Sequence, residues 1–69
     1  MIYDNVKRIA DEQNIPITVL EERVGMGRGA IGKWREAMPR IDNLVNVAKA
    51  LNVTVSDLLE DTDAVPQQN

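Results

Sequence analysis

Apolar residues recur along the chain at intervals of three and four, the spacing that gathers them on one face of an α-helix. Ile2, Val6 and Ile9 follow this spacing near the N-terminus, and Leu44 and Leu51 belong to a similar series further on. The pattern predicts helices over about 2–13, 17–24, 28–36 and 41–51, and a fifth helix that begins after residue 54. We therefore expect an all-α fold.

Residues that begin or end helices stand at the boundaries of this pattern. Pro16 suits the first turn of a helix, where its missing N–H group is no loss. Gly25 is expected to end the second helix in a left-handed conformation, and Pro39 should end the third. Thr54 can cap the last helix, with Asp57 near the positive end of the helix dipole. These signals support five short helices joined by tight connections.

The end of the chain differs in character from the rest. Leu58 and Leu59 are both expected to close the hydrophobic core from the last helix. Beyond residue 60 the chain offers little to bury, so we expect residues 61–69 to form a disordered acidic and polar tail. A chain of 69 residues is sized for one domain, which we place at residues 1–60.

Composition argues against several classes of function. The chain has no cysteine and no histidine, so it lacks thiolate metal ligands and the commonest general base. Ser56 is its one serine, and without histidine a Ser-His-Asp triad cannot form. We expect a protein that is not an enzyme and needs no metal or cofactor. No apolar run reaches about 18 residues and the N-terminus lacks a signal-peptide pattern, so we expect a cytoplasmic protein with no membrane partner.

The net charge of −3 conceals an uneven distribution. Residues 1–55 hold all eight basic residues against seven acidic ones, whereas residues 56–69 hold four acidic residues and no basic one. Within residues 23–40 there are five basic residues and one acidic residue, a net charge of +4. A basic stretch of this kind can form a surface that faces phosphates.

Residues 17–36 have the pattern of two short helices joined by a tight turn. Such a helix-turn-helix needs apolar residues on both sides of the turn, a glycine in it, and two apolar residues three apart on the second helix. In this chain these positions hold Leu20, Val24, Gly25, Met26, Ile31 and Trp34. Trp34 is therefore expected in the core. The outer face of the second helix stays free, and in DNA-binding versions it enters the major groove.

Several stretches of the chain resemble the helix-turn-helix family of phage Cro and C1-type repressors, also called the XRE family. The resemblance is carried by ITVLEERVG at 17–25, by GAIGKW at 29–34, and by residues 44–59, which end in NVTVSDLL. It covers about residues 2–60, nearly the whole of the expected domain. The resemblance implies a five-helix bundle of the lambda-repressor-like DNA-binding type, in which residues 28–36 are the recognition helix.

The resemblance also implies which residues meet double-stranded DNA. The DNA-binding residues expected from it are Gly27, Arg28, Gly29, Gly32, Lys33, Arg35, Arg40 and Asn43. The first five occupy the positions that read bases in relatives. Arg28 suits a bidentate contact with guanine, and Lys33 could reach a base or a phosphate. Arg40 and Asn43 are expected to contact the DNA backbone.

Three features depart from the family's pattern. Relatives usually carry a small residue, often alanine, where this chain has Glu21, although some close relatives have glutamate there. They commonly have a polar residue, often glutamine, where it has Ile17. Three of the five base-reading positions are glycine, which offers no side chain. A turn explains Gly25, but the sequence indicates no structural need for Gly29 or Gly32.

Two functions of different classes fit these observations. The first is a sequence-specific transcriptional regulator of the phage or mobile-element type that occupies an operator as a homodimer. The second is an antirepressor or co-regulator whose helix-turn-helix domain mainly binds a cognate repressor protein. The basic stretch and the resemblance favour the first. The overall negative charge, the acidic tail and the glycine-rich recognition helix favour the second.

Overall fold

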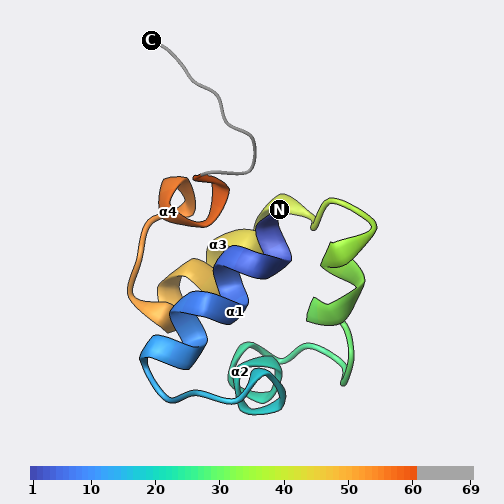
Figure 1. Ribbon diagram of the computed structural model, residues 1–69. Coiled ribbons are helices and arrows are strands. Elements are labelled where there is room, and N and C mark those ends of the chain that lie inside the picture. Colours follow the sequence, from blue (N-terminus) through green and yellow to red (C-terminus); the bar gives the residue numbers. More distant parts are fainter. Residues whose placement is uncertain (61–69) are drawn as a thin grey trace, which may run out of the picture.

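The computed structural model describes residues 1–60, which fold into helices joined by short connections (Figure 1). The elements are α1 (Ile2–Glu12), α2 (Ile17–Val24), the 3₁₀ helix η1 (Ile31–Arg35), α3 (Ile41–Leu51) and α4 (Val55–Leu59). Residues 1–60 contain no strand, so the expected all-α class is confirmed. The tail predicted for residues 61–69 lies outside the described residues. Within residues 1–60, no helix combines the length and the apolar character needed to cross a membrane.

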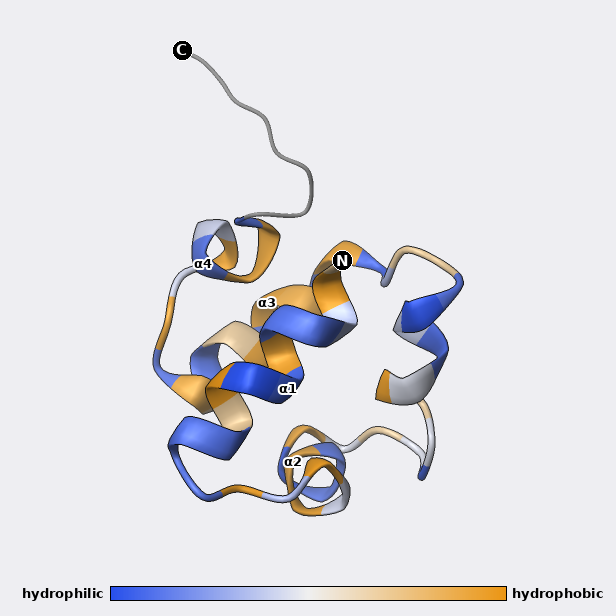
Figure 2. Cartoon of the chain, viewed as in Figure 1, coloured by the Kyte–Doolittle hydropathy of each residue, from blue (hydrophilic) through white to orange (hydrophobic). Residues whose placement is uncertain are grey.

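α1 lies across the middle of the domain and contacts elements at both ends of the chain. It packs against α2, η1 and α4, while α3 packs against α2 and α4. Figure 1 shows α3 behind α1, with α4 above this pair and α2 below it in the view. The side of α1 that faces the viewer in Figure 2 is mainly hydrophilic, which leaves its apolar side for the interior. η1 is thus attached to the helix at the centre of the fold.

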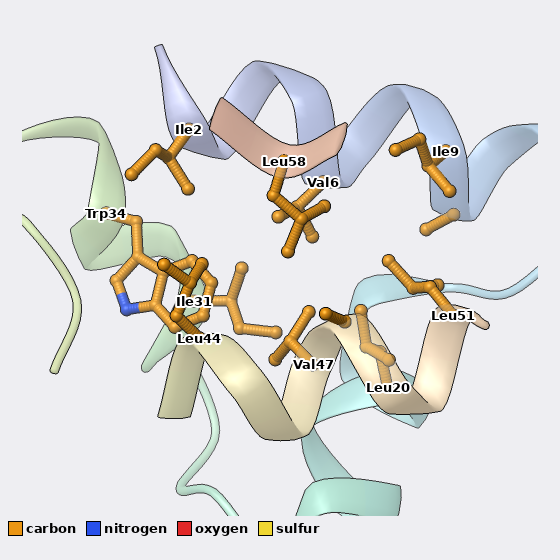
Figure 3. Close-up of a cluster of buried hydrophobic side chains, with 12 residues drawn as sticks. Ile2, Val6, Ile9, Leu20, Ile31, Trp34, Leu44, Val47, Leu51 and Leu58 are labelled. Atoms are coloured by element: carbon orange, nitrogen blue, oxygen red, sulfur yellow. The ribbon is translucent and has the colours of Figure 1, made fainter. Parts of the chain in front are cut away.

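The core consists of aliphatic side chains from all five elements and one tryptophan. Its buried apolar members are Ile2, Val6, Ile9, Ala10, Leu20, Ile31, Trp34, Leu44, Val47, Ala48, Leu51 and Leu58. Figure 3 shows Ile2, Val6 and Ile9 of α1 on one side of this cluster and the side chains of α3 on the other. Trp34 is only 8% exposed, which confirms the prediction that it belongs to the core.

Only one of the two leucines expected to close the core does so. Leu58 is fully buried, whereas Leu59 is 40% exposed, so the prediction was wrong for Leu59. Neighbouring residues of a helix point about 100° apart. α4 has only five residues and packs against α1 and α3 through Leu58, which leaves Leu59 on the side of the helix that is partly exposed.

The predicted helix ends at Thr54 and Gly25 are present. Thr54 Oγ1 accepts a hydrogen bond from the backbone N–H of Asp57, and Asp57 Oδ2 accepts one from the N–H of Thr54, both at 3.0 Å. These reciprocal bonds form a capping box at the start of α4. Gly25 ends α2 with a φ of +75°, the left-handed conformation in which glycine is favoured.

The third helix is shorter than predicted and of a different type. An α-helix over 28–36 was expected, but residues 28–30 form a turn and only Ile31–Arg35 is helical, as a 3₁₀ helix. Gly29 has a φ of +86°, and a right-handed helix cannot continue through that conformation. The helical part therefore begins only after the glycine.

Candidate nucleic-acid interface

α2, the turn that follows it and η1 are held together from the inside. Leu20 of α2 and Ile31 of η1 are both fully buried in the common core. The turn is tightened by a hydrogen bond of 2.9 Å from the backbone N–H of Met26 to the carbonyl oxygen of Glu21. Apolar burial thus fixes the two elements, and the backbone fixes the direction in which the chain leaves α2.

Glu21 connects α2 to the recognition segment, defined here as residues 27–36. The residue is only 2% exposed. Its Oε1 accepts a hydrogen bond from the N–H of Gly29 at 3.1 Å, and its Oε2 accepts one from the N–H of Ile31 at 3.0 Å. A buried carboxylate needs such partners, because it has lost its hydration. We call this pair of hydrogen bonds the Glu21 clasp.

Sequence reasoning missed the Glu21 clasp and treated Glu21 only as a departure from the family's pattern. The sequence did hold a signal. Glu21 stands where relatives usually have a small residue, and Gly29 follows it eight residues later. The side chain needs donors inside the domain, and the unusual turn at Gly29 supplies them.

Of the three glycines in the recognition segment, the structure requires glycine at one position only. Gly29 has a φ of +86°, so a residue with a Cβ would be strained there, and the expectation that it has no structural need was wrong. A Cβ added at Gly27 would meet nothing within 4 Å, and one at Gly32 would meet only Arg35 Nη1 at 3.8 Å. The fold does not require glycine at Gly27 or Gly32.

Arg28 and Lys33 are the two basic side chains of the segment that lie free on its surface. Both residues are exposed. Neither forms a salt bridge within residues 1–60. Arg28 borders a shallow depression that it shares with Thr18 and Glu22 of α2. Both cations can therefore approach an anionic ligand without first giving up an internal partner.

Arg35 has an internal partner, although it is also exposed. Its guanidinium carbon lies 4.1 Å from the centre of the Tyr3 ring, which is the geometry of a cation–π contact. This contact joins the end of η1 to the first turn of α1. The phosphate contact predicted for Arg35 stays a prediction.

Arg40 and Asn43 stand apart from the recognition segment, at the start of α3. Arg40 is 82% exposed, and its Nε lies 3.5 Å from Asp42 Oδ1. Exposed ion pairs of this kind contribute little to stability, so a phosphate can replace the carboxylate. Asn43 is half-buried in the first turn of α3, and its N–H donates to Asp42 Oδ1 at 2.9 Å. The predicted DNA-binding residues thus fall into two groups, at 27–35 and at 40–43.

The charge of the segment suits an anionic ligand. Residues 27–36 contain three basic residues and one acidic residue, Glu36. The apolar side of η1 is buried through Ile31 and Trp34, so the charged side chains lie on its outer side. Within residues 1–60, no cluster of acidic side chains is placed to hold a metal ion. The segment thus presents its cations on an element that is anchored to the core through Ile31 and Trp34.

Two short helices joined by a tight glycine turn, with basic side chains on the outer side of the second, define a helix-turn-helix protein. A family model of the Cro/C1-type helix-turn-helix DNA-binding domain matches residues 5–64. The chain belongs to this family, which confirms the resemblance seen in its sequence. Comparisons with curated proteins and with solved structures gave no significant match.

Proposed function

We propose that this protein is a sequence-specific transcriptional regulator of the phage or mobile-element type, which occupies an operator by placing residues 28–36 in the major groove. The observation that carries the proposal is the exposure of Arg28 and Lys33 on a segment whose Ile31 and Trp34 are buried. Such a segment presents its cations to DNA in a fixed position. Membership of the Cro/C1-type family supports the same function.

Base readout would depend on two side chains. Arg28 is suited to the O6 and N7 atoms of guanine, and Lys33 to a base or a phosphate. Arg35, Arg40 and Asn43 would contact phosphates and fix the orientation of the domain. Glycine at 27, 29 and 32 offers no side chain for base contacts, so each copy of the domain would specify few base pairs.

A domain that reads few base pairs gains specificity by pairing with a second copy. We expect the regulator to act as a homodimer on two half-sites about 34 Å apart, one turn of the duplex. It would act in the cytoplasm, without a cofactor or an enzymatic activity.

A groove beside the N-terminus favours a second candidate function. Met1, Met38 and Leu59 are large apolar side chains that are 53%, 75% and 40% exposed. They line one groove together with Trp34. Apolar side chains gathered on a surface are typical of protein contacts. Together with the net charge of −3, this groove favours an antirepressor or co-regulator that binds a cognate repressor.

Selection from a pool of random duplexes tests the first function directly. The regulator should enrich one short motif and bind it at least about 10³-fold more tightly than unrelated DNA at physiological salt. Failure to enrich any sequence would contradict the proposal. Binding of the purified protein to a repressor encoded beside it, in the same buffer, would then support the second function.

A further inference from the structure

Glu21 is buried, and its carboxylate forms no salt bridge in the part of the chain that the structure describes. Its carboxylate oxygens accept hydrogen bonds from the amides of Gly29 and Ile31. A carboxylate is costly to bury even when it is hydrogen-bonded, and a small apolar residue would avoid that cost. Such a residue would leave the N–H groups of Gly29 and Ile31 without this acceptor, so the two hydrogen bonds are what the acidic side chain adds.

We propose that Glu21 is a positioning residue for DNA recognition, whose clasp sets the path of the chain at residues 29–31 and thereby directs Arg28 toward the operator. The inference rests on the proposed function, and it names a residue that contacts no DNA. It gives the acidic residue Glu21 of α2 and the left-handed glycine Gly29 of the turn one common role.

The recognition segment has few other means of holding its shape. η1 has only five residues, and 3₁₀ hydrogen bonds have poorer geometry than those of an α-helix. Gly29 and Gly32 add backbone freedom that must be lost when the segment is ordered. The two hydrogen bonds of the Glu21 clasp lie on either side of Ala30, so they fix this stretch of backbone relative to α2.

Arg28 is the side chain that the clasp controls most directly. It precedes Gly29, the first residue of the clasp, and it borders the same depression as Glu21. A small rotation of the peptide at 29 would swing the long arginine side chain away from a base edge. Bidentate readout of guanine tolerates little such error, because two hydrogen bonds must form at once.

If Glu21 positions Arg28, its substitution should weaken binding to the operator. Its charge alone predicts the opposite, tighter binding. Phosphates repel a carboxylate, so removal of its charge should tighten DNA binding if nothing else changes. The variant Glu21→Gln keeps the size of the side chain and one acceptor oxygen. Its NH₂ group would face an N–H donor, so one hydrogen bond of the clasp is lost. The sign of the change in affinity therefore separates positioning from charge.

The experiment compares the full chain with Glu21→Gln and with the control Glu22→Gln, on the selected operator and on a random duplex. Glu22 is the adjacent carboxylate on α2 and is exposed, so its substitution changes the charge equally without touching the clasp. Glu21→Gln should bind the operator about tenfold more weakly than the wild type, while its affinity for random duplex is kept or rises. Glu22→Gln should bind both duplexes at least as tightly as the wild type. Operator binding by Glu21→Gln as tight as that of Glu22→Gln overturns the proposal.

A double-mutant cycle tests whether Glu21 acts through Arg28. In an Arg28→Ala background the Glu21→Gln change should weaken operator binding by less than about threefold, because the side chain that the clasp directs is already gone. If the losses of operator affinity from Glu21→Gln and Arg28→Ala are fully additive, Glu21 does not act through Arg28. If the wild-type protein selects no operator, the proposed function and this inference are both overturned. If the wild type binds an operator and Glu21→Gln binds it equally tightly, the inference alone is overturned.

Amide exchange separates a local effect from loss of the fold. In Glu21→Gln the amides of Gly29 and Ile31 should exchange faster, while those of α1 and α3 keep their protection. Faster exchange confined to these two amides, together with weaker operator binding, supports positioning. If Glu21→Gln and Glu21→Ala both unfold, the carboxylate supports the whole domain and the proposal is overturned.

Discussion

Asn5 of α1 donates a hydrogen bond to the carbonyl oxygen of Leu58 in α4, which is 53 residues away in the chain. The side-chain amide of Asn5 donates to Leu58 O at 2.8 Å and to Glu60 O at 2.6 Å, and the residue is 6% exposed. The last carbonyl groups of a helix have no partner within it. Asn5 supplies one for α4, which is too short to be stable by itself.

Replacement of Asn5 by alanine should lower the free energy of unfolding by about 1–3 kcal/mol, because buried carbonyl groups lose their donor. Asn46→Ala is the matched control, since Asn46 is exposed on α3 and its loss should change stability by less than about 0.5 kcal/mol. Urea denaturation gives both values. Equal midpoints for the two variants would contradict the role assigned to Asn5.

The capping box of α4 predicts a smaller effect at Thr54. Thr54→Ala removes the oxygen that accepts from the Asp57 amide and should cost about 1 kcal/mol of stability. Ser56→Ala removes a hydroxyl from the same helix at an exposed position, and should be nearly neutral. A Thr54→Ala variant as stable as Ser56→Ala in thermal unfolding would be evidence against the cap.

The two interior glycines of the recognition segment should respond differently to alanine. Gly29→Ala places a Cβ in the left-handed region and should destabilise the domain by about 1–2 kcal/mol. Gly32→Ala places a Cβ in ordinary contact with the flexible side chain of Arg35, at 3.8 Å from its Nη1, and should leave stability unchanged or raise it by about 0.4–1 kcal/mol. Thermal unfolding of the pair checks this, and the reverse order would mean that the turn at Gly29 is not as described.

Substitution of the free cations should affect binding and not folding. Arg28→Ala should weaken operator binding by about 1–3 kcal/mol and relax specificity at one base pair, and Lys33→Ala should also weaken binding. Arg23→Ala is the control, because Arg23 is exposed on the last turn of α2, outside the recognition segment. Gel-shift titrations measure the affinities, and circular dichroism checks the fold. Operator affinities equal to that of Arg23→Ala would remove both residues from the interface.

The sequence predicted the parts of the fold that depend on local pattern. The spacing of Leu44, Val47 and Leu51 identifies the buried face of α3, and the Thr54–Asp57 pair identifies the start of α4. Both signals arise within a few residues, because helix periodicity and caps are local. The same holds for Gly25, which ends α2 where predicted.

What the sequence did not reveal depends on contacts between distant residues. The hydrogen bonds of Asn5 and of Gln13, whose side chain donates to Leu51 O at 2.7 Å, need the helices in place before they can form. The prediction of an α-helix over 28–36 was wrong for a similar reason. The Glu21 clasp stabilises a left-handed turn at Gly29, and this tertiary contact overrides the helical pattern of Ile31 and Trp34.

The candidate site was predicted only in part. Its location and the exposure of Arg28 and Lys33 followed from the helix-turn-helix pattern. The stacking of Arg35 on Tyr3 and the need for glycine at Gly29 required the structure. Contact of these residues with DNA stays a prediction.

The salt dependence of DNA binding tests the central claim most directly. A regulator that neutralises phosphates releases counterions, and the slope of log affinity against log salt is about −0.9 per phosphate contact. With Arg28, Lys33, Arg40 and Arg35 available in each copy, a homodimer on its operator should give a slope of about −4 to −7, with a specific complex that survives at about 0.15 M salt. Gel-shift titrations at three salt concentrations, on DNA from the protein's own promoter region, give this slope. A slope near zero, or retention that is non-specific and disappears below about 0.15 M salt, would contradict DNA binding as the function of this domain.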